Sequence, residues 1–388
     1  MKDKPFTRLF ATNAMSPAFE KGMIIIMTSQ NSAKHILLSE WIKSNIEDGT
    51  FLPGKKIPSE HELASQFNYS RQTVRQAIGN LVTEGILTRE QGSGTYVALL
   101  KPKAPLKKTM RIGVITTYLD DYIFPSIIHG IDEILTSSGY TLSLGITHNK
   151  PADEENCLRQ MIQTGVDGII IEGTKSALPN SNIHLYNQLK EQQIQTVFIN
   201  SFYGNDCDSY VVMDDIKSGK LVTDYLIQNG HGKIGGILKS DDIQGIKRYE
   251  GIVNSLKEKE IPINDKSIIW YTTEDLNYLF NGTMDSIILD RLSDVTSVVC
   301  YNDQIASKLI QLLKRNNLKT PDDISIISFD NSFLAKEMVC NLTSVVYPSK
   351  KIGKKAATML LARINNNSLK ESIKIEPTLK IRGSVKSI

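Results

Sequence analysis

The sequence lacks several features that would place a protein in a particular class. Its four cysteines, Cys157, Cys207, Cys300 and Cys340, are scattered without a CxxC pair, which predicts reduced thiols and neither a disulfide framework nor a metal site. No apolar run approaches the roughly 20 residues that span a membrane. The apolar run over residues 23–27 is also too short for the core of a signal peptide. We therefore expect a cytoplasmic protein without a membrane partner.

Charge and glycine patterns exclude few classes of protein. The 45 basic and 42 acidic residues leave a net charge of +3, which neither requires nor excludes nucleic acid, because a small basic surface can exist within a balanced total. Walker and dinucleotide glycine fingerprints are both missing, so no nucleotide cofactor is predicted, and we expect no cofactor at all. A length of 388 residues fits two or three domains.

The first 27 residues have no helical periodicity, and we expect an extension without stable structure there. An alternative is that translation starts at Met23 or Met27, and that the preceding residues are a wrongly assigned start.

Residues 28–98 have the pattern of three helices followed by a hairpin. Apolar residues at helical spacing (Ile36, Leu37, Trp41, Ile42 and Ile46) predict a first helix that ends at Asp48-Gly49. Ser59 and Ser70 are suitable N-caps for a second helix over 61–67 and a third over 71–84. Two short strands, over 86–88 and 95–97, flank a glycine-containing turn. This order predicts a winged helix-turn-helix, an α+β domain.

The third predicted helix begins with two arginines on one face. Arg71 and Arg75 are four residues apart, and an arginine fork in the major groove binds O6 and N7 of guanine. A solvated helix face is the usual explanation for such a pair in isolation. The short helix before it and the hairpin after it favour DNA binding instead, with Ser70, Gln72 and Thr73 near bases or phosphates and the tip over 91–95 in the minor groove.

Several motifs in this region, at the correct mutual spacing, resemble the GntR-family winged helix. They are the stretches over 52–64, 70–77, 85–87 and 92–95. The resemblance implies DNA contacts by Arg71, Arg75 and the hairpin tip, and backbone contact or positioning roles for residues before the second helix. The full predicted DNA-binding set is Lys34, Lys56, Pro58, Ser59, Glu60, Ser70, Arg71, Gln72, Thr73, Arg75, Gln91, Gly92, Ser93, Gly94 and Thr95.

A lysine- and proline-rich linker over 99–109 precedes a second region, 110–388, in which apolar strands alternate with amphipathic helices. Strands are predicted over 111–115, 141–146, 168–171, 196–199, 210–213, 234–237, 298–300 and 324–329. Alternation of this kind is typical of parallel sheets covered by helices on both faces. About 280 residues suffice for two such lobes, with a ligand cleft between them at the carboxyl ends of the strands.

Polar and aromatic residues follow many of these strands, where a cleft needs them. Each alone is more typical of a helix cap or a turn, but their repetition favours a site for a sugar, whose hydroxyls need donors and acceptors and whose C–H face packs on a ring. The predicted effector-binding residues are Tyr118, Asp121, Phe124, Glu172, Lys175, Asn200, Asp214, Arg248, Asn302, Asp303, Asp330 and Tyr347.

Residues 110–388 resemble the effector domain of LacI/GalR repressors, itself similar to periplasmic sugar-binding proteins. The resemblance is carried by the stretches over 112–115, 166–170, 230–231, 248–251, 301–306, 321–327, 329–330 and 342–345. It implies effector contacts at Phe124, Asn200, Arg248, Asn302 or Asp303, Asp330 and Tyr347, and a homodimer formed through this domain.

A GntR-type head on a LacI-type sensor is similar to the arabinose-repressor family, most particularly over 116–128 and 172–178. Gly173 and Tyr347 depart from that family's proline and histidine. The resemblance implies a homodimeric repressor on double-stranded operator DNA, with L-arabinose or a related sugar as the effector.

Three alternatives remain open at this level. The two lobes alone are compatible with a secreted solute-binding protein, although the winged helix and the missing signal peptide argue against it. A sugar hydrolase that uses Glu172 and Asp330 as paired carboxylates is a second possibility, but no feature marks either residue as a catalyst. A protein of the same architecture that senses another sugar or acts as an activator is the third.

Overall fold

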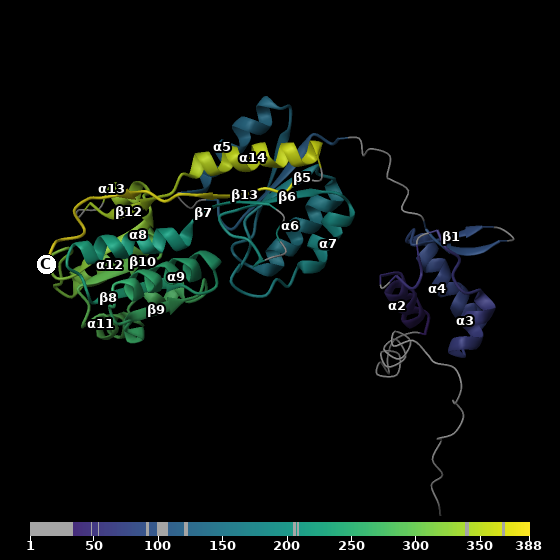
Figure 1. Cartoon of the computed structure of the whole chain (residues 1–388), viewed down its shortest axis with the longest axis horizontal. Helices are drawn as coiled ribbons and strands as arrows, with labels where there is room; N and C mark the ends of the chain where they lie inside the picture. Colours follow the sequence, from purple (N-terminus) through teal and green to yellow (C-terminus); the bar gives the residue numbers. More distant parts are fainter. Residues whose placement is uncertain are drawn as a thin grey trace, which may run out of the picture. The chain divides into compact units, whose positions relative to one another are not determined.

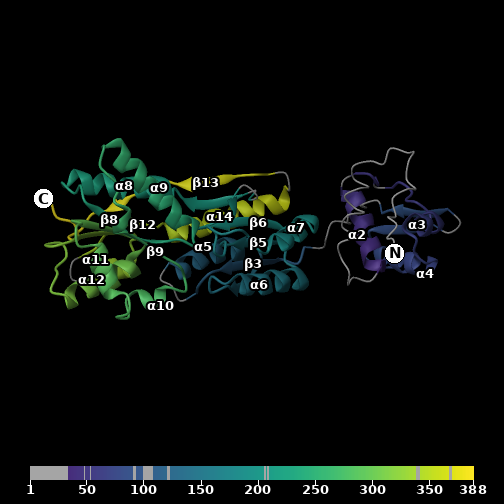
Figure 2. The same ribbon diagram turned by 90° about the horizontal axis from the view of Figure 1, so that it is seen from below.

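A computed structural model describes residues 34–47, 49–52, 54–90, 93–98, 108–119, 123–204, 207, 209–337, 341–366 and 369–388. The expectations for residues 1–27, and for most of the linker over 99–109, fall outside these ranges. Internal contacts divide the chain into a unit that ends at Lys107 and a unit over Lys108–Ile388. We call these the head and the sensor and describe each by itself (Figures 1 and 2).

The head is a winged helix-turn-helix, as predicted. It contains α2 (Lys34–Glu47), α3 (Glu60–Phe67) and α4 (Arg71–Thr83), followed by the antiparallel hairpin of β1 (Leu87–Glu90) and β2 (Gly94–Val97). Ser59 caps α3 in a capping box with Glu62, and the backbone N–H and hydroxyl of Ser59 hold the pKa of the Glu62 carboxyl below its usual value. Ser70 caps α4 by accepting the N–H of Thr73 at 3.1 Å.

The three helices of the head share one apolar core. The predicted face of α4 is confirmed, because Val74, Ala77, Ile78 and Leu81 are all fully buried. In α2 the prediction needs one correction: Ile36 is 45% exposed, and Leu38 is buried in the core. At the amino-terminal end of α2 the buried apolar face therefore begins at Leu37, one residue later than predicted.

The sensor has two lobes, each built on a six-stranded sheet. The first sheet has the order β13-β7-β6-β5-β3-β4 and the second β14-β12-β11-β10-β8-β9. The strands of the first are β3 (Arg111–Thr116), β4 (Thr141–Ile146), β5 (Gly168–Ile171), β6 (Gln195–Ile199), β7 (Tyr210–Met213) and β13 (Ser372–Ile375). Those of the second are β8 (Ile234–Lys239), β9 (Ile268–Tyr271), β10 (Ser297–Cys300), β11 (Ser325–Asp330), β12 (Thr343–Val346) and β14 (Leu379–Lys380).

Every pair in these sheets is parallel except that of β12 and β14. The predicted parallel α/β architecture is thus confirmed, with one antiparallel edge. The sequence analysis did not predict β9, β12, β13 or β14 as strands. Polar residues interrupt the four-residue runs of β12 and β13, and β14 has only two residues, so their apolar pattern is weak. The run Ile-Ile-Trp-Tyr of β9 is apolar and aromatic, and the sequence analysis overlooked it.

Helices cover both faces of each sheet (Figure 1). In the first lobe, α5 (Phe124–Ser137) and α14 (Ser349–Asn365) pack on one face, and α6 (Pro151–Thr164) and α7 (Ile183–Glu191) on the other. In the second lobe, α8 (Asp215–Gln228) and α9 (Ile243–Glu258) pack together on one face, and α11 (Asp285–Arg291) and α12 (Asp303–Arg315) lie on the other. Short helices α10 (Leu276–Leu279) and α13 (Phe333–Glu337) complete this lobe.

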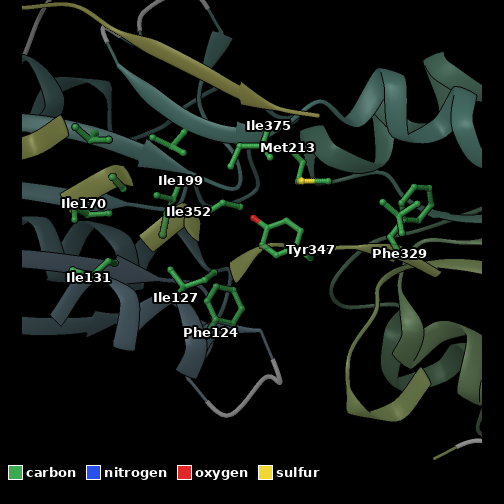
Figure 3. Packing of buried hydrophobic residues seen from close by; sticks show 14 of the residues in the cluster. Phe124, Ile127, Ile131, Ile170, Ile199, Met213, Phe329, Tyr347, Ile352 and Ile375 are labelled. Carbon is green, nitrogen blue, oxygen red and sulfur yellow. The ribbon is translucent and has the colours of Figure 1, made fainter. Parts of the chain in front are cut away.

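The chain passes between the lobes three times, after β7, after β12 and after β13. Tyr347 stands in the second of these crossovers. Figure 3 shows its ring between Phe124 and Ile352 of the first lobe and Phe329 of the second. The carboxyl ends of both sheets meet at these crossovers, and this edge is where parallel α/β sheets bind ligands.

Candidate ligand cleft and nucleic-acid interface

In the head, the predicted DNA contacts gather around the amino-terminal turn of α4. Arg75 is 69% exposed, and its Nε donates to Glu60 at 3.2 Å. Arg71 approaches the His61 ring, with 3.4 Å between Nη2 and Nδ1. Ser70 and Thr73 are joined through their hydroxyls at 2.8 Å, so both are engaged in capping α4. Both arginines are thus exposed at this turn, whereas the hydroxyls of Ser70 and Thr73 are engaged with each other.

The remaining predicted contacts surround this turn or line the hairpin. Lys56 forms an isolated β-bridge with Tyr96, and its side chain lies against Gly94, where a Cβ would meet it. Lys34 lies 5.4 Å from the ring centroid of Tyr69. Pro58 and Ser59 precede α3, and Gln72 is exposed on α4. Ser93 directly precedes β2, and Gly94 and Thr95 are its first two residues, whereas Gln91 and Gly92 fall outside the described residues.

The sequence analysis missed one basic residue beside this set. Arg89 of β1 donates to the same Glu60 carboxylate as Arg75, at 3.0 Å, and its side chain is 44% exposed. A strand pattern that alternates faces could have placed Arg89 beside the core, but its partner Glu60 lies 29 residues away in sequence.

In the sensor, a cavity of about 420 Å³ opens between the carboxyl ends of the two sheets. Seven of the twelve predicted effector-binding residues line it: Tyr118, Phe124, Glu172, Arg248, Asn302, Asp330 and Tyr347. Asp121 falls outside the described residues. The other four, Lys175, Asn200, Asp214 and Asp303, do not line the cavity, and each has another role.

Arg248 is buried and held from several sides. Its Nε donates to Asp215 at 2.9 Å and its Nη1 to the carbonyl of Tyr301 at 2.5 Å. Its guanidinium also lies over the rings of Tyr301 and Phe329, 4.9 and 4.3 Å from their centroids. Burial opposes its charge, but Asp215, Tyr301 and Asp330 together raise the pKa of Arg248 above its usual value. The cavity therefore contains a permanently charged donor in a fixed orientation.

Glu172 is a buried acceptor in the opposite wall. It accepts the N–H and hydroxyl of Thr117 at 2.8 and 2.5 Å and the amide of Asn200 at 2.9 Å. Burial raises its pKa to about 7, although these hydrogen bonds act in the other direction. Asn200 in turn accepts the hydroxyl of Tyr347. Asn200, predicted as a ligand contact, thus joins two cavity-lining side chains without lining the cavity itself.

Asp303, also predicted for the cleft, does not line the cavity. It is fully buried and accepts hydrogen bonds from three serines: Ser328, Ser332 and Ser344. These bonds join the start of α12 to β11, to the loop after β11 and to β12. The neighbouring Asn302 lines the cavity, and its side chain also caps α12.

Asp214 and Lys175 lie elsewhere as well. Asp214 caps α8 by accepting the N–H of Lys217 at 3.1 Å, and it lines a smaller cavity of about 90 Å³ beside the crossover. Lys175 forms an ion pair with Glu274 at 2.6 Å, between the loops that follow β5 and β9. Both residues thus fix the protein around the cleft without forming its wall.

Several lining residues were not predicted, most of them from the second lobe. They are Thr117, Ile123, Lys239, Asp242, Gln244, Tyr271, Thr273, Leu276, Asn277, Tyr301, Gln304 and Ile305. Lys239 ends β8, two residues beyond the predicted end of that strand. A correctly placed strand end would have indicated Lys239 and the Asp242 cap of α9, because ligands bind beyond the carboxyl ends of strands.

The two lobes touch at the rim of the cavity. Ser176 donates to Asp242 at 3.1 Å and accepts the N–H of Ile243 at 3.0 Å. Asn149 donates to Thr273 at 2.6 Å. Asp242 also accepts the hydroxyl of Tyr301 at 2.7 Å, so this rim contact reaches a lining side chain.

The charges of the lining favour a neutral, hydroxyl-rich ligand. Among the described lining residues are three carboxylates, Glu172, Asp242 and Asp330, and two cations, Lys239 and Arg248. Because Asp215 already pairs with Arg248, acidic groups outnumber basic ones around the cavity. An anionic ligand would be repelled, whereas hydroxyls can donate to the carboxylates and accept from the cations.

Comparison with known proteins agrees with both units. Residues 38–97 match the family model described as bacterial regulatory proteins of the gntR family, and residues 223–385 match that of a periplasmic binding protein-like domain. An arabinose metabolism transcriptional repressor of Halalkalibacterium halodurans is 38% identical over 360 residues, which cover 90% of this chain and 96% of that protein. A protein of the same description from Geobacillus stearothermophilus is 39% identical over 365 residues, which cover 93% and 100%.

The chain belongs to the family of arabinose metabolism transcriptional repressors. The curated relatives are described as transcriptional repressors. A solved complex described as transcriptional regulator CelR with cellobiose has a TM-score of 0.64, covers 84% of this chain and 100% of its own, and is 18% identical, which supports the fold alone. Within the described residues, no helix has the length and apolar character needed to cross a membrane.

Proposed function

We propose that this protein is a cytoplasmic, sequence-specific repressor of arabinose utilisation genes that L-arabinose releases from operator DNA. The observation that carries the proposal is the buried Arg248, held by Asp215 in a cavity lined by three carboxylates and aromatic rings. This combination matches the needs of a neutral sugar. The names of the curated relatives support arabinose as the sugar.

For the head, we propose that Arg71 and Arg75 contact bases in the major groove and that the hairpin tip approaches the minor groove. The exposure of both arginines at the capped start of α4 supports this assignment. The other members of the predicted set contact phosphates or position the helix. A homodimer would present two heads to a palindromic operator.

For the sensor, we propose that hydroxyls of L-arabinose donate hydrogen bonds to Glu172, Asp242 and Asp330 and accept hydrogen bonds from Arg248. The sugar would then hold the two lobes together and favour the state with low DNA affinity. Coupling of roughly 1–3 kcal/mol would change operator affinity about 5- to 150-fold. The protein would act by binding alone, so incubated arabinose would be recovered unchanged.

Titration calorimetry of the full-length protein tests the ligand assignment. We expect heat of binding with L-arabinose, weaker binding with D-xylose and D-galactose, and no binding with a phosphorylated pentose, because the acidic lining repels phosphate. Tight binding of the phosphorylated sugar, or no binding of any neutral pentose, would contradict the proposal.

A further inference from the structure

The head contains a carboxylate that joins two arginines from different elements. Glu60, in the first turn of α3, receives Arg75 of α4 at 3.2 Å through one oxygen and Arg89 of β1 at 3.0 Å through the other. Glu60 itself is 28% exposed, whereas the two arginines are 69% and 44% exposed. The cluster therefore lies on the surface and has one more positive charge than negative.

The hairpin register places Arg89 at the edge of the head's core. Leu87 and Val97 are directly paired and buried, and the next pair on the same face, two residues further along, is Arg89 with Thr95. Thr95 belongs to the predicted contact set of the hairpin. Arg89 thus belongs to the hairpin itself, and Glu60 joins its guanidinium to that of Arg75 near the start of α4.

Fold stability gives little reason for this arrangement. Ion pairs between exposed side chains contribute little, because water screens them and both side chains lose freedom. A phosphate can therefore take over one arginine without a large loss to the fold. The shared carboxylate also restricts the directions that both guanidinium groups can take before DNA arrives.

We propose that Arg89 binds a phosphate of the DNA backbone between the base contacts of α4 and the hairpin tip, and that Glu60 positions Arg75 and Arg89 together. This inference rests on the proposed DNA-binding function and adds a contact that neither the sequence motifs nor the family resemblance assigned. Arg89 adds affinity for any duplex, while Glu60 adds discrimination by directing Arg75 toward a base.

Salt titrations distinguish these roles. Binding is measured by anisotropy with a fluorescein-labelled promoter fragment of an arabinose operon and with a scrambled duplex of equal length, from 50 to 200 mM salt. We expect Arg89→Ala to lower the affinity for both duplexes by a similar factor, about 5- to 10-fold at low salt. It should also reduce the slope of log affinity against log salt concentration by about 1. Arg89→Lys should keep the slope.

The Glu60→Gln variant tests the positioning role. We expect the scrambled duplex to bind at least as tightly as it binds the wild type, because one repulsive charge is gone, while the ratio of promoter to scrambled affinity falls. Arg159→Ala is the matched control, since it removes an exposed arginine paired with Glu155 at 2.8 Å in the sensor.

Other outcomes overturn the inference. If Arg89→Ala left both affinities, the slope and the melting temperature unchanged, Arg89 would not contact DNA and its ion pair with Glu60 would have no part in binding. Loss of promoter binding alone would make Arg89 a base contact. An unchanged affinity ratio for Glu60→Gln would remove the positioning role. Failure of the wild type to bind either duplex would instead contradict the proposed function, which separates the two claims.

Discussion

Ser176, in the loop after β5, donates a hydrogen bond to Asp242, the N-cap of α9, at 3.1 Å and so joins the two lobes at the rim of the cavity. The same carboxylate receives Tyr301, which lines the cavity. Under the proposed function, a ligand in the cleft would lie beside this rim contact and, like it, hold the lobes together. The first prediction about the sensor depends on this contact.

Ser176→Ala should weaken L-arabinose binding about tenfold. A hydrogen bond to a charged group contributes roughly 1.5–3 kcal/mol, and this one exists only while the lobes are together. Calorimetry measures the affinity, and Ser137→Ala, which removes an exposed hydroxyl bonded to a helix carbonyl, is the control. Equal sugar affinity in Ser176→Ala and the wild type would show that the rim contact does not contribute to closure.

Arg248→Ala should abolish sugar binding, but it also leaves Asp215 buried without its partner, at a cost of about 3–5 kcal/mol in the free energy of unfolding. The double variant Arg248→Met with Asp215→Asn removes both charges. We expect it to unfold near the wild-type midpoint in guanidinium while L-arabinose binding stays lost and operator binding is retained. Sugar binding by a folded double variant would refute the role of Arg248.

Glu172 should give the sensor a distinct pH dependence. Its pKa is about 7 in the folded protein, against 4.5 ordinarily, so between these values the folded chain holds a proton that the unfolded chain has lost. Protonated Glu172 therefore contributes up to about 3 kcal/mol to the free energy of unfolding. This contribution is complete below pH 4.5 and is lost as the pH rises to about 7.

Glu172→Gln isolates this effect from other titrating groups. Chemical unfolding of both proteins without sugar should show that the wild type loses stability relative to Glu172→Gln between pH 5 and pH 8. If the difference between the two proteins were the same at both pH values, Glu172 would not carry the proton.

Arg71→Ala should weaken promoter binding roughly 5- to 150-fold, because a bidentate arginine–guanine contact supplies about 1–3 kcal/mol of discrimination. L-arabinose affinity, measured by calorimetry on the same sample, should stay unchanged, since Arg71 belongs to the head. Fluorescence anisotropy at one fixed salt concentration measures the affinity for the promoter fragment. A variant that loses sugar binding as well would contradict the division of labour between head and sensor.

The sequence was most informative where a local pattern decides the structure. The buried face of α4 was predicted from helical spacing alone. The N-cap roles of Ser59 and Ser70 were predicted from the hydrogen-bonding chemistry of serine. Seven cavity-lining residues followed from their position after strands, together with the family resemblance. These features depend on residues close to one another in the chain.

The sequence was less informative where residues from distant parts of the chain surround a side chain. Asp303 follows a strand as a cleft residue should, yet Ser328 and Ser344, from two other segments, enclose it. Asn200 supports the wall because Glu172 and Tyr347 approach it from separate elements. Arg89 had no local signal, because Glu60 lies far away in sequence. In each case the partner, and not the residue type, determines the role.

The most direct test of the central claim is fluorescence anisotropy of a labelled promoter fragment of an arabinose operon with the full-length protein, at fixed salt, titrated with L-arabinose. Salt must be fixed because phosphate contacts make affinity strongly salt-dependent. The account predicts tight binding and release by L-arabinose, but not by equal concentrations of D-xylose or D-galactose. Binding that L-arabinose leaves unchanged would contradict it.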